Sequence, residues 1–410
     1  MNLYSIITIV VSLAAIFAYV NYRFLKLPST IGIMLISLIS SLCIVALGIF
    51  NPELTLSINA VVKSLDFYDL LINIMLSFLL FAGAIHVNAD RLKKERLPVI
   101  ALATIGTILS TLIVGTMLYY LLQAFGHGIN LIYCLLFGAL ISPTDPIAVL
   151  GILKQANIPQ SLEMKITGES LFNDGVGVVI FLALLEISKT GIDNISAGDI
   201  TLLFVKEAGG GLIFGVLLGY LGFYMLKSID NYQVEVLITL AIVMGGYTLA
   251  NALHVSGPLA MVIAGIITGN KGKEEGMSDV TRDYLGKFWE LTDEILNAVL
   301  FLLIGLEMLV VKFDNKILFI GLVCILIVLV ARWISVFIPI TILKRFIPFE
   351  KNVVTMLTWG GLRGGISVAL ALSLPEQMYR NELVSITYII VIFSIVVQGL
   401  TVGKIAKLTQ

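Results

Sequence analysis

Long runs of apolar residues, separated by short polar stretches, follow one another along almost the whole chain. Each run is continuously apolar and does not alternate with polar positions. This pattern favours membrane-spanning helices over the strands of a transmembrane β-barrel. From these runs we predict about thirteen spans, at residues 3–20, 30–49, 67–87, 98–122, 130–152, 163–187, 203–226, 234–252, 256–269, 291–311, 317–343, 352–373 and 384–403.

The composition narrows the class of protein. The chain has 410 residues, of which 58% are hydrophobic and 13% are charged, with a net charge of −1. A soluble protein with this balance would expose large apolar patches, and so small a net charge gives no field that attracts nucleic acid. The three cysteines lie inside apolar runs, without the spacing of a disulfide framework or a metal site. We therefore exclude a soluble enzyme, a nucleic-acid-binding protein and a disordered chain, and predict an all-α polytopic membrane protein.

The basic residues predict how the chain is oriented. With the N-terminus outside, most of the 26 Lys and Arg residues fall in connections on the cytoplasmic side, where positive charge is enriched in membrane proteins. We expect a multi-pass protein of the plasma (inner) membrane, with its C-terminus in the cytoplasm. The polar stretch 270–290 is then expected to be a cytoplasmic linker with a surface-lying helix.

Five charged residues lie inside the predicted spans, where a charge is costly and usually functional. Counting 1.5 Å per helical residue places the two aspartates roughly 10–20 Å from the cytoplasmic face and the two arginines about 16–18 Å from it. These depths agree well enough to predict a single polar centre. The five residues are Asp145, Glu169, Asp174, Arg332 and Arg363.

Two of the spans contain sequences that interrupt a helix. Ser142-Pro143-Thr144-Asp145-Pro146 has two prolines, which remove backbone donors, and Gly360-Gly361-Leu362-Arg363-Gly364-Gly365 has four glycines. These are the fifth and twelfth spans, seven apart, which predicts two inverted-topology six-helix repeats with a site between broken helices 5 and 12. A proline kink in which Asp145 caps the following half-helix remains an alternative.

The span 163–187 carries most of the remaining polar residues. Ser170 and Asp174 are four residues apart and share one helix face, which offers hard oxygen ligands to a small cation. Glu169 and Asn173 share the adjacent face, so that Glu169 can meet a cationic partner. A polar network of the capping type is the alternative interpretation.

With these motifs, the chain resembles the monovalent cation/proton antiporters, in particular the NhaP/NHE-like sodium/proton exchangers. The resemblance covers nearly the whole chain and rests on Thr144-Asp145-Pro146, Glu169 to Gly175, Ala331-Arg332, Gly361 to Gly365 and Gln398 to Thr401. It implies one transmembrane exchanger domain over residues 1–410 in which broken helices 5 and 12 cross. It also implies core helices at about 67–187 and 291–403, and dimerisation helices at about 1–49 and 203–269.

The resemblance also implies a role for each polar residue. Asp174 is the carboxylate shared by cation and proton, and Asp145, Ser170 and the Thr144 backbone carbonyl help to hold Na+. Asn173 follows the electroneutral branch of the family. Glu169 forms a structural ion pair with Arg332, and Arg363 is the other candidate partner because it lies at a similar depth.

Two positions bear on ion selectivity and pH response. Some relatives carry an acid in the third span that reaches the ion, and Ala82 stands at the matching place here, which leaves one oxygen fewer. His86 lies one turn further toward the cytoplasm. It is either a pH-tuning residue at the entrance or an ordinary interfacial histidine.

The function expected from this resemblance is secondary active antiport of Na+ (or Li+) against H+, electroneutral at 1:1, by alternating access. K+/H+ antiport with the same fold is the alternative, and a cation channel is a more distant one. The break at Thr144-Asp145-Pro146 does not suit an intramembrane aspartyl protease, so we expect no enzyme activity. We expect a homodimer among membrane lipids, with cation and proton as substrates, no cofactor and no nucleic-acid partner.

Overall fold

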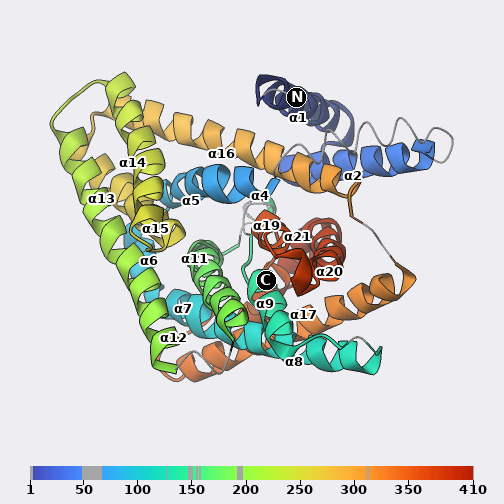
Figure 1. Ribbon diagram of the computed structural model, residues 1–410. Helices are drawn as coiled ribbons and strands as arrows, with labels where there is room; N and C mark the ends of the chain where they lie inside the picture. The colour runs from blue at the N-terminus through green and yellow to red at the C-terminus, as the bar shows by residue number, and fades with distance from the viewer. Residues whose placement is uncertain are drawn as a thin grey trace.

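The computed structural model describes residues 3–48, 67–126, 128–145, 151–153, 156, 158–191, 197–311 and 314–409. Over these residues the regular secondary structure is helical, and the only β-type contact is an isolated bridge between Asp145 and Leu362 (Figure 1). The prediction of an all-α fold is therefore confirmed.

The N-terminal half of the chain forms helices at the positions of the first six predicted spans. Each apolar run became a helix because only a helix satisfies its own backbone polar groups in lipid. The helices are α1 (Leu3–Val20), α2 (Ser29–Gly48), α4 (Phe67–Asp69), α5 (Leu76–Ile85), α6 (Ala89–Lys94), α7 (Arg96–Ala101), α8 (Thr107–Ala124), α9 (Leu131–Ile141) and α11 (Gln160–Thr190).

The C-terminal half continues in the same way, and short π-helical segments join α4 to α5, α7 to α8, α12 to α13 and α20 to α21. The helices are α12 (Ala197–Phe204), α13 (Gly210–Lys227), α14 (Tyr232–Ala252), α15 (Gly257–Ile267), α16 (Asp279–Glu307), α17 (Asn315–Leu343), α18 (Val353–Trp359), α19 (Gly365–Leu372), α20 (Arg380–Phe393) and α21 (Gly399–Thr409).

Nine helical stretches among the described residues are long and apolar enough to cross a membrane. The shorter helices α9, α18 and α19 belong to the two spans that the sequence predicts to be broken. The chain is thus a multi-pass membrane protein, and the number thirteen stays a prediction.

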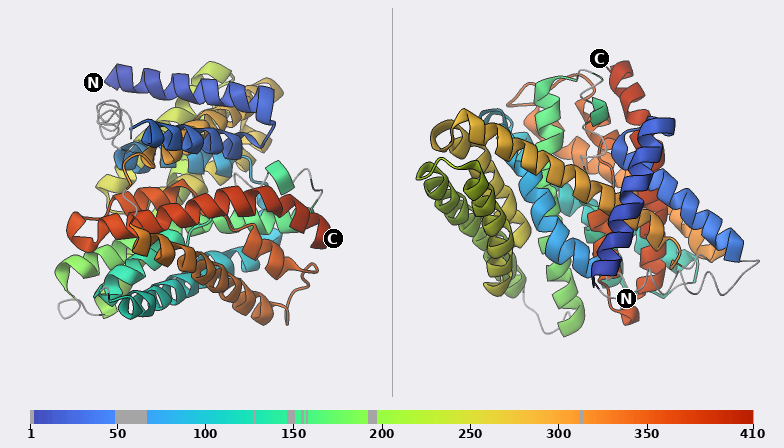
Figure 2. Two further views of the ribbon diagram at one scale, coloured as in Figure 1. Left: turned by 90° about the vertical axis from the view of Figure 1, so that its right-hand side faces the viewer. Right: turned by 90° about the horizontal axis from the view of Figure 1, so that it is seen from above.

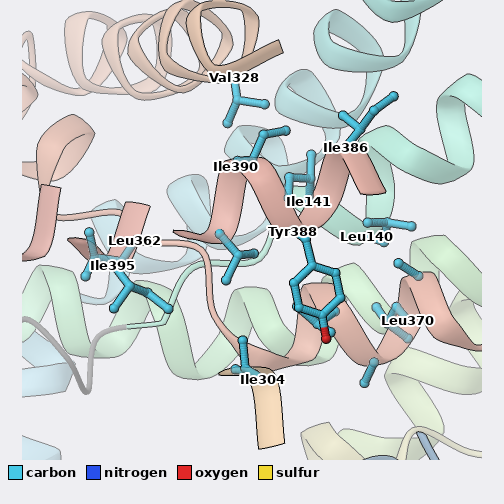
Figure 3. Packing of buried hydrophobic residues seen from close by; sticks show 14 of the residues in the cluster. Leu140, Ile141, Ile304, Val328, Leu362, Leu370, Ile386, Tyr388, Ile390 and Ile395 are labelled. Carbon is cyan, nitrogen blue, oxygen red and sulfur yellow. The ribbon is translucent and has the colours of Figure 1, made fainter. Parts of the chain in front are cut away.

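The helices form two packed groups. One contains α8, α9, α11 and α17 to α21, and its apolar side chains converge around Tyr388, Leu362 and Ile141 (Figure 3). The other is built on α5, α13, α14 and α15, with Phe81 packed against Trp289 of α16 at 4.7 Å between ring centroids and an angle of 54° between the ring planes. Seen from the side, the two groups lie in separate layers (Figure 2).

Two helices inside the core ranges that the resemblance implies also make contacts outside those ranges. The helix α5, which lies within 67–87, packs on α15 and α16 and shares the apolar cluster of α13 to α15. The helix α16 also packs along α2 (Figure 1). The helix α5 thus packs with the segment 203–269, and α16 packs with both 1–49 and 203–269. The apolar side chains of α16 between Val299 and Leu306 belong to the cluster of the first group. The division of the chain into core and dimerisation helices stays a prediction.

The stretch 270–290 is also different from its prediction as a linker with a surface-lying helix. The helix α16 begins at Asp279, where the Ser278 side chain accepts a hydrogen bond from the Thr281 backbone, and it continues without a break to Glu307. Its charged first turns are thus part of one long helix that enters the molecule. Consequently Asp293 lies fourteen residues into a helix, about 21 Å along its axis.

An ion cluster around the buried Lys165 links the helix α11 to two connections. The Lys165 ammonium of α11 is 3.1 Å from Glu95, between α6 and α7, and 2.9 Å from Glu350, between α17 and α18. Ser161 also donates to Glu350. Burial opposes ionisation of the Glu350 carboxyl, but the hydrogen bonds from Ser161 and Lys165 outweigh it and hold the pKa of Glu350 below its usual value.

We expect Glu350→Gln to destabilise the protein at pH 7 by roughly 1–3 kcal/mol, the scale of a charge-assisted hydrogen bond. A carboxyl whose pKa is lower in the folded state adds stability that is complete above the unfolded value of about 4.3 and is lost as pH falls through the folded value. The thermal midpoint of the variant in detergent should thus lie below that of the parent at pH 7 and converge with it once pH falls below the folded pKa of Glu350. A constant difference at all pH values would contradict this prediction.

Candidate functional site

The two interrupted helices cross at the centre of the molecule. α9 ends at Ile141, with Ser142 still in a helical conformation, and residues 143–145 continue as a non-helical segment. The second interruption lies between α18 and α19. The Asp145 backbone N–H donates to the Leu362 carbonyl at 2.8 Å, which joins the two non-helical segments as an antiparallel bridge. Breaks of this kind survive at membrane depth only when protein groups satisfy their free backbone atoms.

Arg363 supplies much of that compensation. Its side chain is buried, and its Nη1 donates to the carbonyls of Ser142 and Pro143 at 2.5 and 3.0 Å. Its own backbone N–H donates to the Ser394 hydroxyl at 2.9 Å. The guanidinium of one broken helix therefore binds the carbonyls of the other and is not the hydrogen-bonding partner of Glu169.

Glu169 pairs with Arg332 instead. Both nitrogens of the Arg332 fork donate to the Glu169 carboxylate, Nη2 at 2.9 Å, and both residues are buried. Nε and Nη2 also donate to the Leu357 carbonyl at the end of α18. Gly361 permits this arrangement, because a Cβ there would lie 2.6 Å from Arg332 Nε. The pair thus links α11, α17 and the second broken helix.

Asn173 and Ser170 of α11 hold the first non-helical segment in place. The Asn173 amide forms two hydrogen bonds with Thr144: its Nδ2 donates to Thr144 Oγ1 at 2.8 Å, and its Oδ1 accepts from the Thr144 N–H at 3.2 Å. The Ser170 hydroxyl donates to the Thr144 carbonyl. These contacts fix the backbone just before Asp145.

Asp174 and Asp145 face a cavity of about 850 Å³. Asp174 is largely buried at 8% exposure, and the two carboxylates are close enough to repel each other. The Asp145 carboxylate packs against Gly364, where a Cβ would lie 2.3 Å from Oδ2. It therefore sits at the N-terminus of α19, whose dipole favours a negative charge. Ser170 and Thr144 also line the cavity, so all four expected Na+ ligands border one space.

Residues from several helices line this cavity from the buried site to its mouth at the surface of the molecule. The fully buried Ala82 of α5 forms part of the wall near the site. His86 lies at the end of the same helix and is exposed at the mouth, together with Lys26 and Gln160. His86 is thus separated from Asp174 by the depth of the cavity.

Several polar residues of the cavity wall were not among the candidates from the sequence. They include Glu290, Asp293, Glu294 and Asn297 of α16 and Ser367 of α19. Asp293 was missed because it falls at the edge of the apolar run 291–311, where a charge is usual. Asn297 and Ser367 carry no charge, so nothing in an apolar sequence distinguishes them from packing residues.

Two crossing interrupted helices with carboxylates at a deep cavity define a secondary transporter of the inverted-repeat type. The family described as "Sodium/hydrogen exchanger, transmembrane" matches residues 10–408. The chain belongs to this family.

Individual relatives agree with this assignment. The chain is 48% identical to the Na(+)/H(+) antiporter NhaP of Pseudomonas aeruginosa over 97% of this chain and 95% of that protein. It is 34% identical to the Na(+)/H(+) antiporter NhaH of Halobacillus dabanensis, over 94% and 93%. In fold it resembles the sodium proton antiporter MjNhaP1 of Methanocaldococcus jannaschii, with a TM-score of 0.76 and 20% identity over 99% of both chains.

Proposed function

We propose that the chain exchanges Na+ or Li+ for H+ across the plasma membrane, and that Asp174 carries the cation and the proton in turn. The observation that supports this most directly is the position of Asp174, a buried carboxylate on a cavity wall beside the crossing. Asp145, Ser170 and Thr144 border the same space and add hard oxygen ligands suited to an alkali cation.

The exchange follows from the cost of moving charge through an apolar barrier. An empty carboxylate at Asp174 is expensive to carry past the apolar side chains that separate the two sides. Either Na+ or H+ neutralises that charge, so the loaded site moves and the empty site does not. Because both ions need the same carboxylate, each return step carries the other ion, and no second coupling device is required.

We infer that the moving part is the group of α8, α9, α11 and α17 to α21, which contains the crossing. The helices α1, α2, α5 and α13 to α16 would form the stationary part and the homodimer contact. Lys26 and Gln160 at the cavity mouth belong to connections that the basic-residue pattern assigns to the cytoplasm. With the N-terminus outside and the C-terminus inside, the structure would be the inward-facing state.

We expect the exchange to be electroneutral, because Asn173 adds no titrating group beside Asp174 and its amide is already bonded to Thr144. One proton then leaves for each cation bound. In vesicles that contain the purified protein, neither the rate nor the final ion distribution should change when the membrane potential is clamped at different values. A final distribution that moves with the potential would rule out 1:1 exchange.

K+/H+ exchange is the second candidate, and Ala82 is the observation that keeps it open. This residue is fully buried in the cavity wall, and its methyl group offers no oxygen to the cation. Fewer oxygens weaken the preference for a small ion. Recovery of a quenched pH dye in everted vesicles, with Na+, Li+ and K+ added in turn, will rank the three ions.

A further inference from the structure

The helix α16 presents a polar face to the cavity from the wall opposite the crossing. Glu290, Asp293, Glu294 and Asn297 follow one another at spacings of three, one and three residues and all line the cavity. Residues three and four apart lie on one helix face. Glu290 and Glu294 are exposed, whereas Asn297 is 2% exposed and lies deepest along the helix.

The Asn297 side chain is held in one orientation with its oxygen unused. Its Nδ2 donates to the Asp293 backbone carbonyl at 2.8 Å. Its Oδ1 is buried and has no hydrogen-bond partner among the described residues. The same is true of one carboxylate oxygen of Asp293. Leaving buried acceptors unsatisfied is unfavourable, so something else is needed to bind these oxygens.

A third unused oxygen faces the same cavity from α19. Ser367 is 1% exposed, lines the cavity, and its hydroxyl has no partner among the described residues. Asp293 and Asp145 line the same cavity, so their two negative charges oppose each other there. A carboxylate, an amide oxygen and a hydroxyl are hard ligands of the kind that bind alkali cations, and a cation near them would relieve the repulsion.

We propose that Asn297 Oδ1 and the Asp293 carboxylate, with the Ser367 hydroxyl, form a second binding station for a monovalent cation on the path to Asp174. The station rests on the proposed exchange at Asp174 and deepens it. The cation loses part of its water on α16, in the stationary group of helices, before it reaches the carboxylate that moves. Ala82 offers no oxygen to the cation, whereas Asn297 adds one elsewhere in the cavity wall. The station therefore also contributes to the selectivity among Na+, Li+ and K+.

The test uses Asn297→Leu, which keeps the branched shape but removes the oxygen, and Asp293→Asn, which keeps the shape but removes the charge. Asp283→Asn is the matched control, because Asp283 is an exposed acid on the same helix, paired with Lys287 and outside the cavity. Exchange is measured in proteoliposomes at increasing NaCl, LiCl and KCl. We expect both station variants to raise the apparent KM for Na+ about tenfold, to change the order of the three ions, and to keep the maximal rate.

Direct Na+ binding separates this station from the site at Asp174. By calorimetry on purified protein, Asp174→Asn should retain weak Na+ binding that the double variant Asp174→Asn/Asn297→Leu loses. If both station variants show the KM and ion order of Asp283→Asn, water alone satisfies these oxygens and the station is wrong, while exchange at Asp174 stands. If Asp174→Asn itself exchanges normally, the proposed function fails instead. Asp293→Asn keeps the test valid should Asn297→Leu prove misfolded by gel filtration.

Discussion

Asp174→Asn should reduce Na+/H+ exchange to the background of vesicles without the protein. Asparagine matches the shape of aspartate but cannot take up a proton at neutral pH or offer a full negative charge to a cation. Neither ion then competes for the site, and the step that couples them is lost. The measurement is dye recovery on Na+ addition to everted vesicles, over a range of pH and Na+ concentrations.

Substitution of the neighbouring Asp145 should have a smaller effect on exchange than substitution of Asp174. Asp145→Asn should retain exchange but raise the apparent KM for Na+ by about tenfold or more, the effect of losing one charged ligand. The asparagine should still fit against Gly364, so the crossing stays intact. Asp283→Asn, on the exposed part of α16, should behave as the parent protein does. Normal exchange by Asp174→Asn at any pH would disprove the central role of this residue.

Much of the site could be located from sequence because polar residues in a membrane span are rare and carry information. Thr144, Ser170 and Asn173 stood out only because they accompany Asp145 and Asp174 in otherwise apolar runs. The prolines and glycines that break two helices are equally conspicuous, and the bridge from Asp145 to Leu362 shows that the two breaks meet.

The partners of the two arginines could not be decided in the same way. Arg332 and Arg363 lie at similar depth along their spans, and depth is all that a one-dimensional pattern supplies. The direction in which each guanidinium points depends on how the helices pack. In the structure, Gly361 has no side chain to block Arg332, which therefore reaches Glu169. Arg363 instead donates to the carbonyls of Ser142 and Pro143.

The polar face of α16 was not predicted from the sequence, for a different reason. A prediction from hydropathy assigns charged residues to connections. For a helix whose first turns are charged, it therefore predicts only the apolar part as a span. The stretch 270–290 was therefore expected to be a linker with a surface-lying helix of its own. In the structure the Ser278 cap starts one helix that runs from Asp279 through the apolar part to Glu307. The grouping of α5 and α16 with α13 to α15 likewise depends on tertiary packing, such as that of Phe81 on Trp289.

Glu169→Gln should be among the most destabilising single substitutions in the crossing group, by about 3–5 kcal/mol. The change leaves the buried Arg332 charge without its carboxylate, while only neutral acceptors, the new amide oxygen and the Leu357 carbonyl, remain. A buried, uncompensated charge costs far more than the net gain from the pair. We expect a large fall in the thermal midpoint in detergent and low yields of folded protein.

A second substitution shows whether the unpaired charge is the cause. In Glu169→Gln/Arg332→Gln the charge is gone, so the double variant should recover a substantial part of the stability that the single variant loses, although Leu357 then keeps a weaker donor. Glu186→Gln, an exposed acid on the same helix, should leave the thermal midpoint almost unchanged. If the double variant is as unstable as the sum of its two single variants, the pair acts by packing and not by charge compensation. The electrostatic explanation of this contact would then be wrong.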